Sequence, residues 1–448
     1  MDFIPNREQE VAAMLQVIGV SSIEELFSAI PSSLIQSKPQ HDDGLSECEA
    51  LWHMQNLAAK NTFTDYDNYL GAGAYEHYVP AIVSAICSKS EFLSSYTPYQ
   101  AEASQGMLQS IFEYQSAICA LTGMDVANAS LYDGASACAE AALMAMRLQN
   151  ENGKLLIAST LNPFYRGVVD QYLSTHDQEI ETIASSADGR IDLQALKEAL
   201  KQPCIGILMQ SPNFFGIIED VQEIRNLLNS HKCLLLLAAN PLSYGLYSSA
   251  GELGVDIAIG DTQPFGLSTS FGGPYAGYIA CKNELVRQLP GRIVGETVDT
   301  CGKRGFVLTL QAREQHIRRE KATSNICTNQ ALAALATLVA ISWYGKNGVK
   351  ALALTNARRT HYLQQALSEI PGIKLLTRTP VFNEFAVSFS RPVAEVQSHF
   401  RKYAIEPGYS LGCKYPHLQD YILVAVTEMK TKEQLDKYIN TAKGLLQT

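Results

Sequence analysis

The feature that most restricts the fold is the alternation of short apolar strands with helical segments between residues 154 and 281. Strands are expected at 155–158, 180–183, 205–209, 233–239 and 278–281, with another starting at Asp256. Strands this apolar, separated by helices, are typical of a mostly parallel sheet covered on both faces. The sequence therefore predicts an α/β fold.

One of these strands ends in a segment that is suited to a ligand. The strand that starts at Asp256 runs into a polar turn, and Gly266, Gly272 and Gly273 follow before the next strand. Glycines let the backbone approach another group closely. We expect a binding site, or the remains of one, at this strand end.

This strand and turn resemble the part of pyridoxal-phosphate (PLP) enzymes of the aspartate-aminotransferase type that carries the Schiff-base lysine. Here Gln263 and Pro264 stand at the corresponding positions, so no catalytic residue is expected in this chain. In such enzymes a carboxylate one strand earlier keeps the pyridine nitrogen protonated. The chain has Ala238, Ala239 and Asn240 there, and an amide cannot supply that charge. Both losses predict a PLP-type scaffold without chemistry of its own.

Three long motifs narrow the match: GAGAYEHYVP at 71–80, YTPYQAEASQG at 96–106 and RREKATSNICT at 318–328. With them the chain resembles the P-protein family of the glycine cleavage system, the glycine dehydrogenases (decarboxylating), and within it the subunit 1 (alpha) type. The resemblance extends over nearly the whole chain. It implies the PLP-transferase fold type I, with a small C-terminal α/β domain and an N-terminal helical arm.

The resemblance also implies a function and partners. In that family the PLP lysine belongs to subunit 2 (beta), so PLP would be bound mainly by the partner, and none covalently by this chain. The expected reaction is decarboxylation of glycine, with release of CO2 and transfer of the aminomethyl group to the lipoyl arm of H protein. This chain would supply interface and part of the pocket of a heteromeric enzyme, and be inactive alone.

The segment 71–106 mixes aromatic and polar residues, a composition suited to a small polar substrate or a cofactor edge. The alternative is that its tyrosines pack and form ordinary hydrogen bonds. Together with the family resemblance, the composition favours a substrate pocket or channel. The residues assigned to it are Tyr75, His77, Tyr96, Tyr99, Gln100 and Glu102.

Two segments are candidates for holding a phosphate. Gly134, Ala135 and Ser136 precede a helix expected at 138–148, and they match the turn that cradles the cofactor phosphate in PLP relatives. Asp133 places a carboxylate nearby, and a plain helix cap explains the same residues. We therefore interpret them as a degenerate phosphate turn.

The second candidate follows the charged run 313–321. Such a run is usually a solvated helix face. Hydroxyl and amide side chains follow it, where an apolar helix running to Trp343 is expected to start. We therefore expect Thr323 and Asn325 to contact the phosphate of the partner's PLP.

The expected domains are an N-terminal helical arm at 1–65, a large PLP-transferase-like domain at 66–328, and a helix linker with a small α/β domain at 329–448. Two capping boxes are expected in the arm, starting at Ser22 and Ser46. Such arms wrap a partner subunit or cap their own core.

Composition excludes several classes of protein. The formal net charge of −10 argues against nucleic-acid or anionic-membrane binding. The first residues lack the pattern of a signal or transit peptide, so we expect a cytoplasmic protein. The 10 cysteines are scattered without CxxC spacing, so no metal site is expected.

Two other functions remain open. The chain could be a self-sufficient PLP transferase that uses another lysine, with Lys321 or Lys303 the first candidates because they lie near suspected anion-binding residues. Ala238 and Ala239 argue against it. It could also be a purely structural or regulatory binding subunit.

Overall fold

The computed structural model describes residues 6–35, 44–149 and 153–447. The chain divides into two compact units, Met1–Thr62 and Phe63–Thr448. The expected division between a large and a small domain falls within the second unit. In the described residues no helix has the length and apolar character that a membrane span requires.

The regular structure in the described residues of the first unit is helical, and the expected arm at 1–65 stays a prediction. Helix α1 spans Glu8–Ile18 and α2 spans Glu47–Ala58. The second capping box is confirmed, because the amide of Glu49 donates to the hydroxyl of Ser46 and the carboxylate of Glu49 accepts from the Ser46 amide. The box expected at Ser22 is wrong, since Glu25 instead accepts from the Ser21 amide, and only a 3₁₀ turn, Glu24–Phe27, forms.

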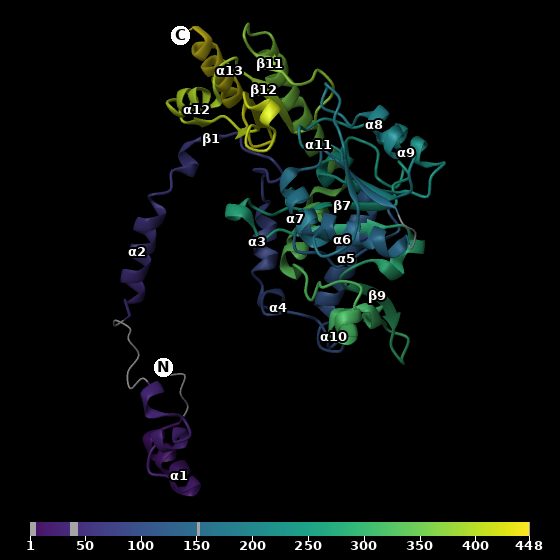
Figure 1. The fold of residues 1–448 in the computed structure, drawn as a ribbon. Coiled ribbons are helices and arrows are strands. Elements are labelled where there is room, and N and C mark those ends of the chain that lie inside the picture. The colour runs from purple at the N-terminus through teal and green to yellow at the C-terminus, as the bar shows by residue number, and fades with distance from the viewer. Residues whose placement is uncertain (1–5, 36–43, 150–152, 448) are drawn as a thin grey trace. The chain divides into compact units, whose positions relative to one another are not determined.

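The second unit is built on a sheet of seven strands, in the order β2-β8-β7-β6-β5-β3-β4 (Figure 1). The strands are β2 (Val126–Ala127), β3 (Lys154–Ala158), β4 (Ile180–Ile183), β5 (Cys204–Gln210), β6 (Leu234–Ala238), β7 (Ile257–Asp261) and β8 (Gly277–Cys281). The ladders from β3 to β7 are parallel, whereas β8 is antiparallel to both β7 and β2. The predicted mostly parallel sheet is confirmed.

Helices cover both faces of this sheet, because alternate strand residues point to opposite sides. In β6, Leu235 and Leu237 pack with one cluster of helices and Leu236 and Ala238 with the other. The first cluster includes residues of α5 (Gln105–Thr122), α8 (Leu193–Ala199), α9 (Val221–Leu228) and α11 (Ala331–Ser368). The second includes α6 (Gly134–Leu148) and α7 (Pro163–Leu173). Burial on both faces explains why the strands read as continuous apolar runs.

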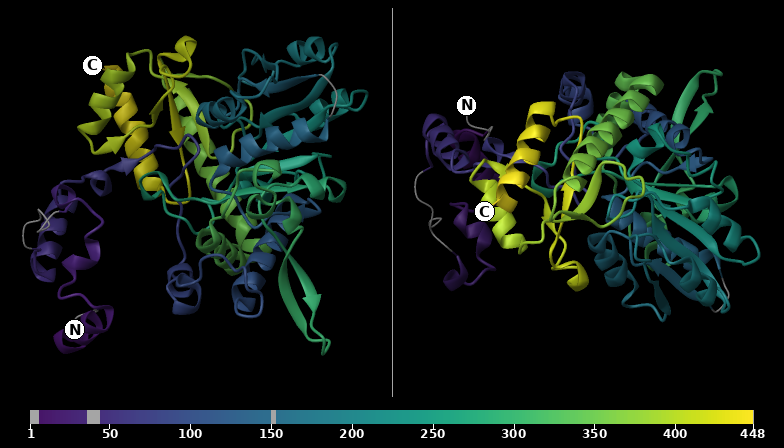
Figure 2. Two further views of the ribbon diagram at one scale, coloured as in Figure 1. Left: turned by 60° about the horizontal axis from the view of Figure 1, so that its bottom comes forward. Right: turned by 90° about the horizontal axis from the view of Figure 1, so that it is seen from above.

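The C-terminal part adds a smaller antiparallel sheet, in the order β11-β12-β15-β14, with two helices (Figure 2). Its elements are β11 (Lys374–Leu375), β12 (Glu384–Ser388), α12 (Val393–Arg401), β14 (Tyr409–Ser410), β15 (Tyr421–Ala425) and α13 (Lys432–Gln447). A short strand β1 (Asp67–Asn68) pairs with β13 (Ile405–Glu406). The first residues of this unit therefore lie against its C-terminal part.

Between β8 and α11 the chain forms a hairpin of β9 (Ile293–Val298) and β10 (Arg304–Thr309). The charged run that follows does not form one helix. It divides into short turns, Gln311–Arg313 and Arg319–Lys321, on either side of α10 (Gln315–Arg318). The usual structure of such a run, a single solvated helix face, does not form: Arg313 and Glu314 turn inward and Glu314 is buried, whereas residues 317–321 are exposed.

Helix α11 starts at Ala331, so the expectation that Thr323, Asn325 and Thr328 begin this helix is wrong. The preceding residues form side-chain to backbone bonds that compete with helical ones. The Ser324 hydroxyl accepts from the Ile326 amide at 3.0 Å, and the Asn329 amide group donates to Ala129 at 2.9 Å. These contacts hold the segment extended.

Candidate functional site: a closed cofactor cavity and an exposed segment

The carboxyl ends of β5, β6 and β7 meet at a cavity of about 30 Å³. Its 10 lining residues include Tyr75, Ala239, Asn240, Asp261 and Pro264, and none is a lysine. Sites for drug-sized ligands and cofactors usually enclose about 300–1,000 Å³, while one water needs roughly 10–15 Å³. The cavity has room for a water or two, and not for PLP.

Gln263 stands at the position where the cofactor lysine was expected, next to Pro264, which lines the cavity. Its side chain is fully buried. Its Oε1 accepts from the Tyr75 amide at 3.0 Å, and its Nε2 donates to the carbonyls of Tyr75 at 2.8 Å and Leu267 at 3.0 Å. The Gln263 side chain thus forms hydrogen bonds to both the amide and the carbonyl of Tyr75 and holds that residue at the end of the sheet.

Glycines allow the segment before Tyr75 to fill this space. Gly73 has a φ of 116°, and a Cβ there would lie 2.7 Å from the Asn162 side-chain nitrogen. That nitrogen donates to the Ala72 carbonyl at 3.0 Å. A side chain at Gly73 would therefore disturb both the backbone conformation and this bond.

The predicted phosphate turn is occupied by carboxylates of the chain itself. Helix α6 starts at Gly134, not at Cys138. The Ser136 amide donates to Asp133 at 2.7 Å and the Gly134 amide donates to Asp261 at 2.9 Å. Two carboxylates at the first turn take up N–H groups that would hold a phosphate, and they repel an anion.

Asn240, at the position expected for the ring carboxylate, has a structural role. The Asn240 side-chain oxygen accepts from the Leu242 amide at 3.0 Å and caps the turn that follows β6. Without a lysine, a ring carboxylate or a free phosphate turn, the residues around this cavity do not fit PLP. No step of PLP chemistry follows from this cavity.

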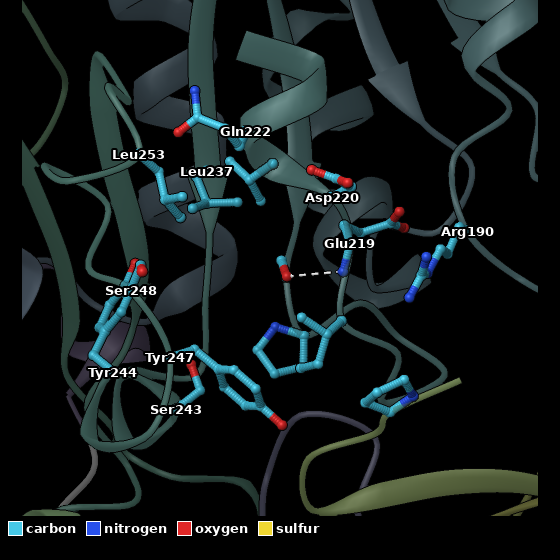
Figure 3. Close-up of a pocket in the computed structure, with 15 residues that line it drawn as sticks. Arg190, Glu219, Asp220, Gln222, Leu237, Ser243, Tyr244, Tyr247, Ser248 and Leu253 are labelled. Carbon is cyan, nitrogen blue, oxygen red and sulfur yellow. Dashed lines mark hydrogen bonds between the residues drawn. The ribbon is translucent and has the colours of Figure 1, made fainter. Parts of the chain in front are cut away.

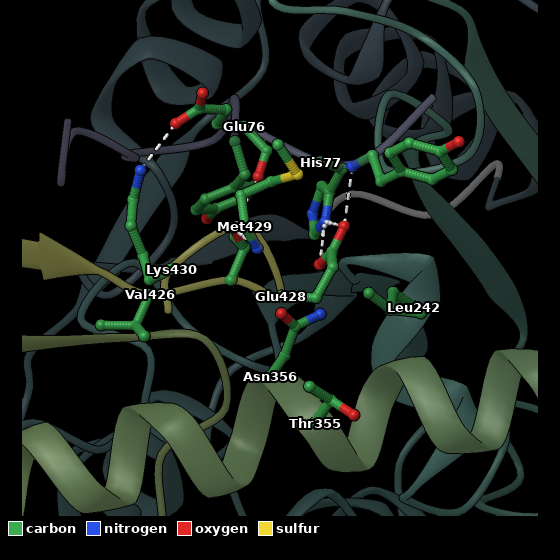
Figure 4. Close-up of polar contacts among 12 residues, drawn as sticks. Glu76, His77, Leu242, Thr355, Asn356, Val426, Glu428, Met429 and Lys430 are labelled. Carbon is green, nitrogen blue, oxygen red and sulfur yellow. Dashed lines mark hydrogen bonds and ion pairs between the residues drawn. The ribbon is translucent and has the colours of Figure 1, made fainter. Parts of the chain in front are cut away.

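Tyr75 and His77 are buried and join the large sheet to the small one. The Tyr75 hydroxyl donates to Glu384 of β12, which also accepts from the Ala72 amide at 3.1 Å. His77 Nδ1 lies 2.9 Å from Glu428 Oε2, and Lys430 pairs with Glu76 at 2.8 Å (Figure 4). These contacts match the packing alternative for Tyr75 and His77, and their part in a substrate channel stays a prediction.

The burial of Glu384 makes the stability of the protein depend on pH. Burial raises the pKa of this carboxyl from 4.5 to about 7, although hydrogen bonds from Tyr75 and Ala72 act to lower the pKa. From pH 4.5 to about 7 the native protein keeps a proton that the unfolded chain has lost, so stability falls as pH rises through this window and levels off above it.

We expect Glu384→Gln, which cannot ionise, to lack that decline. The free energy of unfolding of the wild type should fall relative to the variant by up to about 3 kcal/mol between pH 5 and pH 8. Urea unfolding of both proteins across this range measures the difference. Burial also raises the pKa of Asp261 to about 7, but Asp261 is present in both proteins, so its contribution to the pH dependence cancels in the difference. Parallel profiles would contradict the assignment to Glu384.

A buried arginine joins Tyr99 to the segment before α11. Arg292 is 4% exposed and donates to the Tyr99 hydroxyl at 2.9 Å, to the Cys327 carbonyl, and to Asn329 at 3.3 Å. Its Nε lies 3.7 Å from Glu314. Sequence reasoning missed Arg292, although an arginine inside the apolar run from Leu289 to Val294 signals a buried cation that needs partners.

The other residues assigned to a pocket lie on an exposed segment. Tyr96 is 79% exposed and Tyr99 is 50% exposed, and Gln100 and Glu102 are exposed as well. They stand apart from buried Tyr75 and His77, so the six residues fall into two groups. The exposed group is available to another molecule, and its substrate role stays a prediction.

Thr323 and Asn325 separate as well. Thr323 lines a pocket of about 340 Å³ together with basic side chains, while Asn325 is exposed.

A further pocket, of about 330 Å³, lies beside α9 and the turn after β5, where the Glu219 amide donates to the Ser211 hydroxyl (Figure 3). It contains no residue that the sequence singled out. Within the described residues, no three His, Cys, Asp or Glu side chains are grouped to hold a metal ion.

The model of the glycine cleavage system P-protein family matches residues 1–442. The chain belongs to this family. It is 60% identical to the probable glycine dehydrogenase (decarboxylating) subunit 1 of Protochlamydia amoebophila, over 99% of this chain and 100% of that one. It is 47% identical to the protein of the same name from Anoxybacillus flavithermus, over 98% and 97% of the two chains.

Solved structures agree with this family. A glycine decarboxylase (P-protein) of the glycine cleavage system, in an inhibitor-bound form, superposes with a TM-score of 0.91 at 38% identity, over 99% of this chain and 100% of that one. A NifS-like protein from Rickettsia africae matches over 86% of this chain and 100% of its own, with a TM-score of 0.63 at 12% identity, and shows the fold alone. The predicted PLP-transferase fold type I is confirmed.

Proposed function

We propose that this chain is subunit 1 of a heteromeric glycine decarboxylase and that a lysine-bearing subunit 2 binds PLP. The observation that carries the proposal is the cavity of about 30 Å³, which no lysine lines, beside a buried Gln263 at the position of the cofactor lysine, in a chain with the fold of PLP enzymes. Relatives named as subunit 1 of glycine dehydrogenase support the existence of a second subunit.

The assembled enzyme would decarboxylate glycine, release CO2 and pass the aminomethyl group to the lipoyl arm of H protein in the cytoplasm. PLP supplies the electron sink for this decarboxylation when it is bound to the partner. Subunit 1 would provide a rigid interface, and its exposed segment from Tyr96 to Glu102 would form part of the wall of the partner's pocket. The chain alone would be inactive.

A PLP titration tests this division of labour. The purified chain is titrated alone and then with subunit 2, the Schiff-base absorbance is followed, and adducts are located by borohydride reduction and peptide mapping. We expect a stoichiometric adduct only in the mixture, on the partner's lysine. A stoichiometric adduct of the chain alone, for example on Lys321 or Lys303, would establish a self-sufficient PLP transferase instead.

The proposed contact with the partner's cofactor has its own test. Thr323→Ala combined with Asn325→Ala should weaken PLP retention by the assembled complex about 10-fold, because hydrogen bonds to a charged phosphate are lost. Assembly should be unchanged. PLP release from the isolated complex by gel filtration measures retention, and Ser84→Ala combined with Asn229→Ala, two positions outside the described sites, serves as the control. Equal retention in both double variants would refute the contact.

A further inference from the structure

Four cationic side chains line the pocket that contains Thr323. They are Arg287, Arg313, Arg318 and Lys321, and they surround a hollow of about 340 Å³. The chain as a whole carries a formal net charge of −10. A hollow with four positive charges in an acidic protein concentrates a field of one sign.

These cations have no carboxylate partners in the part of the chain that the structure describes. Neither Arg287, Arg313, Arg318 nor Lys321 forms an ion pair there. Glu314, next to Arg313 in sequence, lies 3.7 Å from Arg292 and 3.6 Å from His316 instead. Glu314 attracts Arg313 without pairing with it, so the protein compensates the repulsion among these cations only in part.

The backbone fixes several of these groups in place. The guanidinium of Arg313 donates to the carbonyls of Leu289 and, at 2.8 Å, of Gly291. Arg318 donates from Nε to the Ala312 carbonyl at 3.1 Å, and among the described residues its two terminal nitrogens have no hydrogen-bond acceptor. The Thr323 amide donates to the Arg313 carbonyl at 3.0 Å, which fixes the Thr323 backbone at the pocket. Donors held in advance lose little entropy when they bind an anion.

We propose that this pocket binds a phosphate group. The planar fork of arginine matches phosphate oxygens, a lysine adds a point charge, and a threonine hydroxyl adds a neutral donor. A dianion would offset the repulsion among the four cations. The phosphate could belong to the cofactor of the partner subunit or to a free phosphate compound. Binding to the chain alone is independent of the proposed function, and only the first of these two sources rests on it.

Inorganic phosphate is the probe. The chain alone is titrated with it by calorimetry and by thermal unfolding, at constant ionic strength maintained with chloride. We expect saturable binding that weakens about 10-fold or more in Arg318→Gln combined with Lys321→Gln, because charge-assisted hydrogen bonds are lost.

The control variant is Arg319→Gln combined with Arg304→Gln, which removes the same net charge. Both residues are exposed, and neither lines the pocket. We expect wild-type affinity in this control. Absence of saturable binding, or equal weakening in the two double variants, would mean a general charge effect or an adventitious ion only, and would overturn the site.

Competition identifies the source of the phosphate. The same titration is repeated on the complex with subunit 2, first without PLP and then loaded. If the partner's cofactor provides the phosphate, loading should abolish phosphate binding, and the pocket variants should lose PLP retention. If a free compound is the ligand, loading should leave phosphate binding unchanged. Failure to assemble with subunit 2 would refute the proposed function and leave the result for the chain alone intact.

Discussion

Arg292→Ala is expected to lower the free energy of unfolding of the second unit by about 3–5 kcal/mol, because it removes the arginine from a buried charge pair and several hydrogen bonds to partly buried acceptors. Arg292 is 4% exposed and contacts Tyr99, Cys327, Asn329 and Glu314. Its loss leaves the buried carboxylate of Glu314 with only His316 in ion-pair distance, at 3.6 Å, and burial already raises the pKa of this carboxyl.

The same change should also affect the enzyme. Arg292 ties the exposed Tyr99 to the segment that carries Thr323, so its loss should release both. We expect turnover of the assembled complex to fall at least about 10-fold under conditions in which the variant is still folded, because displacement of groups around a site by about 1 Å can cost roughly 100-fold.

Arg304→Ala is the matched control for this variant. Arg304 lies on β10 and pairs with Glu296 at 2.8 Å, but both side chains are about half exposed. Exposed pairs contribute about 0–1 kcal/mol. Urea unfolding and turnover measurements on the two variants compare the sites directly. A loss of less than about 1 kcal/mol in Arg292→Ala would show that its contacts do not hold this region together.

Gln263→Leu is expected to cost at least about 3 kcal/mol of unfolding free energy. The substitution keeps roughly the side-chain volume and removes the partner of two buried backbone groups and one partly buried backbone group, and a buried group costs about 1–3 kcal/mol when left unsatisfied. These are the amide and carbonyl of Tyr75 and the carbonyl of Leu267. Because Tyr75 also bonds Glu384, the contact between the two sheets should loosen with it.

Hydrogen exchange at the Tyr75 amide locates this effect, and urea unfolding measures its size. Exchange there should be faster in Gln263→Leu by at least about 10-fold, since the amide loses its acceptor. Gln222→Leu on α9, an exposed position, should change stability by less than about 0.5 kcal/mol. If Gln263→Leu behaves like this control, the bonds of Gln263 to Tyr75 and Leu267 do not stabilise this end of the sheet.

The elements predicted most accurately were those whose signals are local. Helix α9 begins and ends at Val221 and Leu228 as expected, and α7 begins at Pro163 after an Asn162 cap. Apolar runs located every strand from β3 to β7. The start of α6 was placed too late, although a local cap sets it, since Asp133 accepts from the Ser136 amide as in the plain-cap alternative. The start of α11 was placed too early because Asn329 bonds to Ala129, which is far away in sequence.

The candidate site was only partly predictable. The absence of a cofactor lysine can be read at Gln263, because one position decides it. The sequence could not show that Gln263 forms hydrogen bonds to Tyr75, which lies 188 residues away, since no local pattern encodes this pairing. The burial of Tyr75 and His77 and the exposure of Tyr96 were equally hidden, because all three lie in one aromatic and polar segment.

The sequence by itself determined the parallel α/β core, its family and the loss of the cofactor lysine, because periodicity, long motifs and the identity of single residues are local properties. Only the tertiary structure decided that the cavity is too small for the cofactor, that Arg292 joins Tyr99 to the segment before α11, and that four cations share one pocket. Each of these depends on side chains from distant segments, and the distances and burial that set their energies exist only in the folded chain.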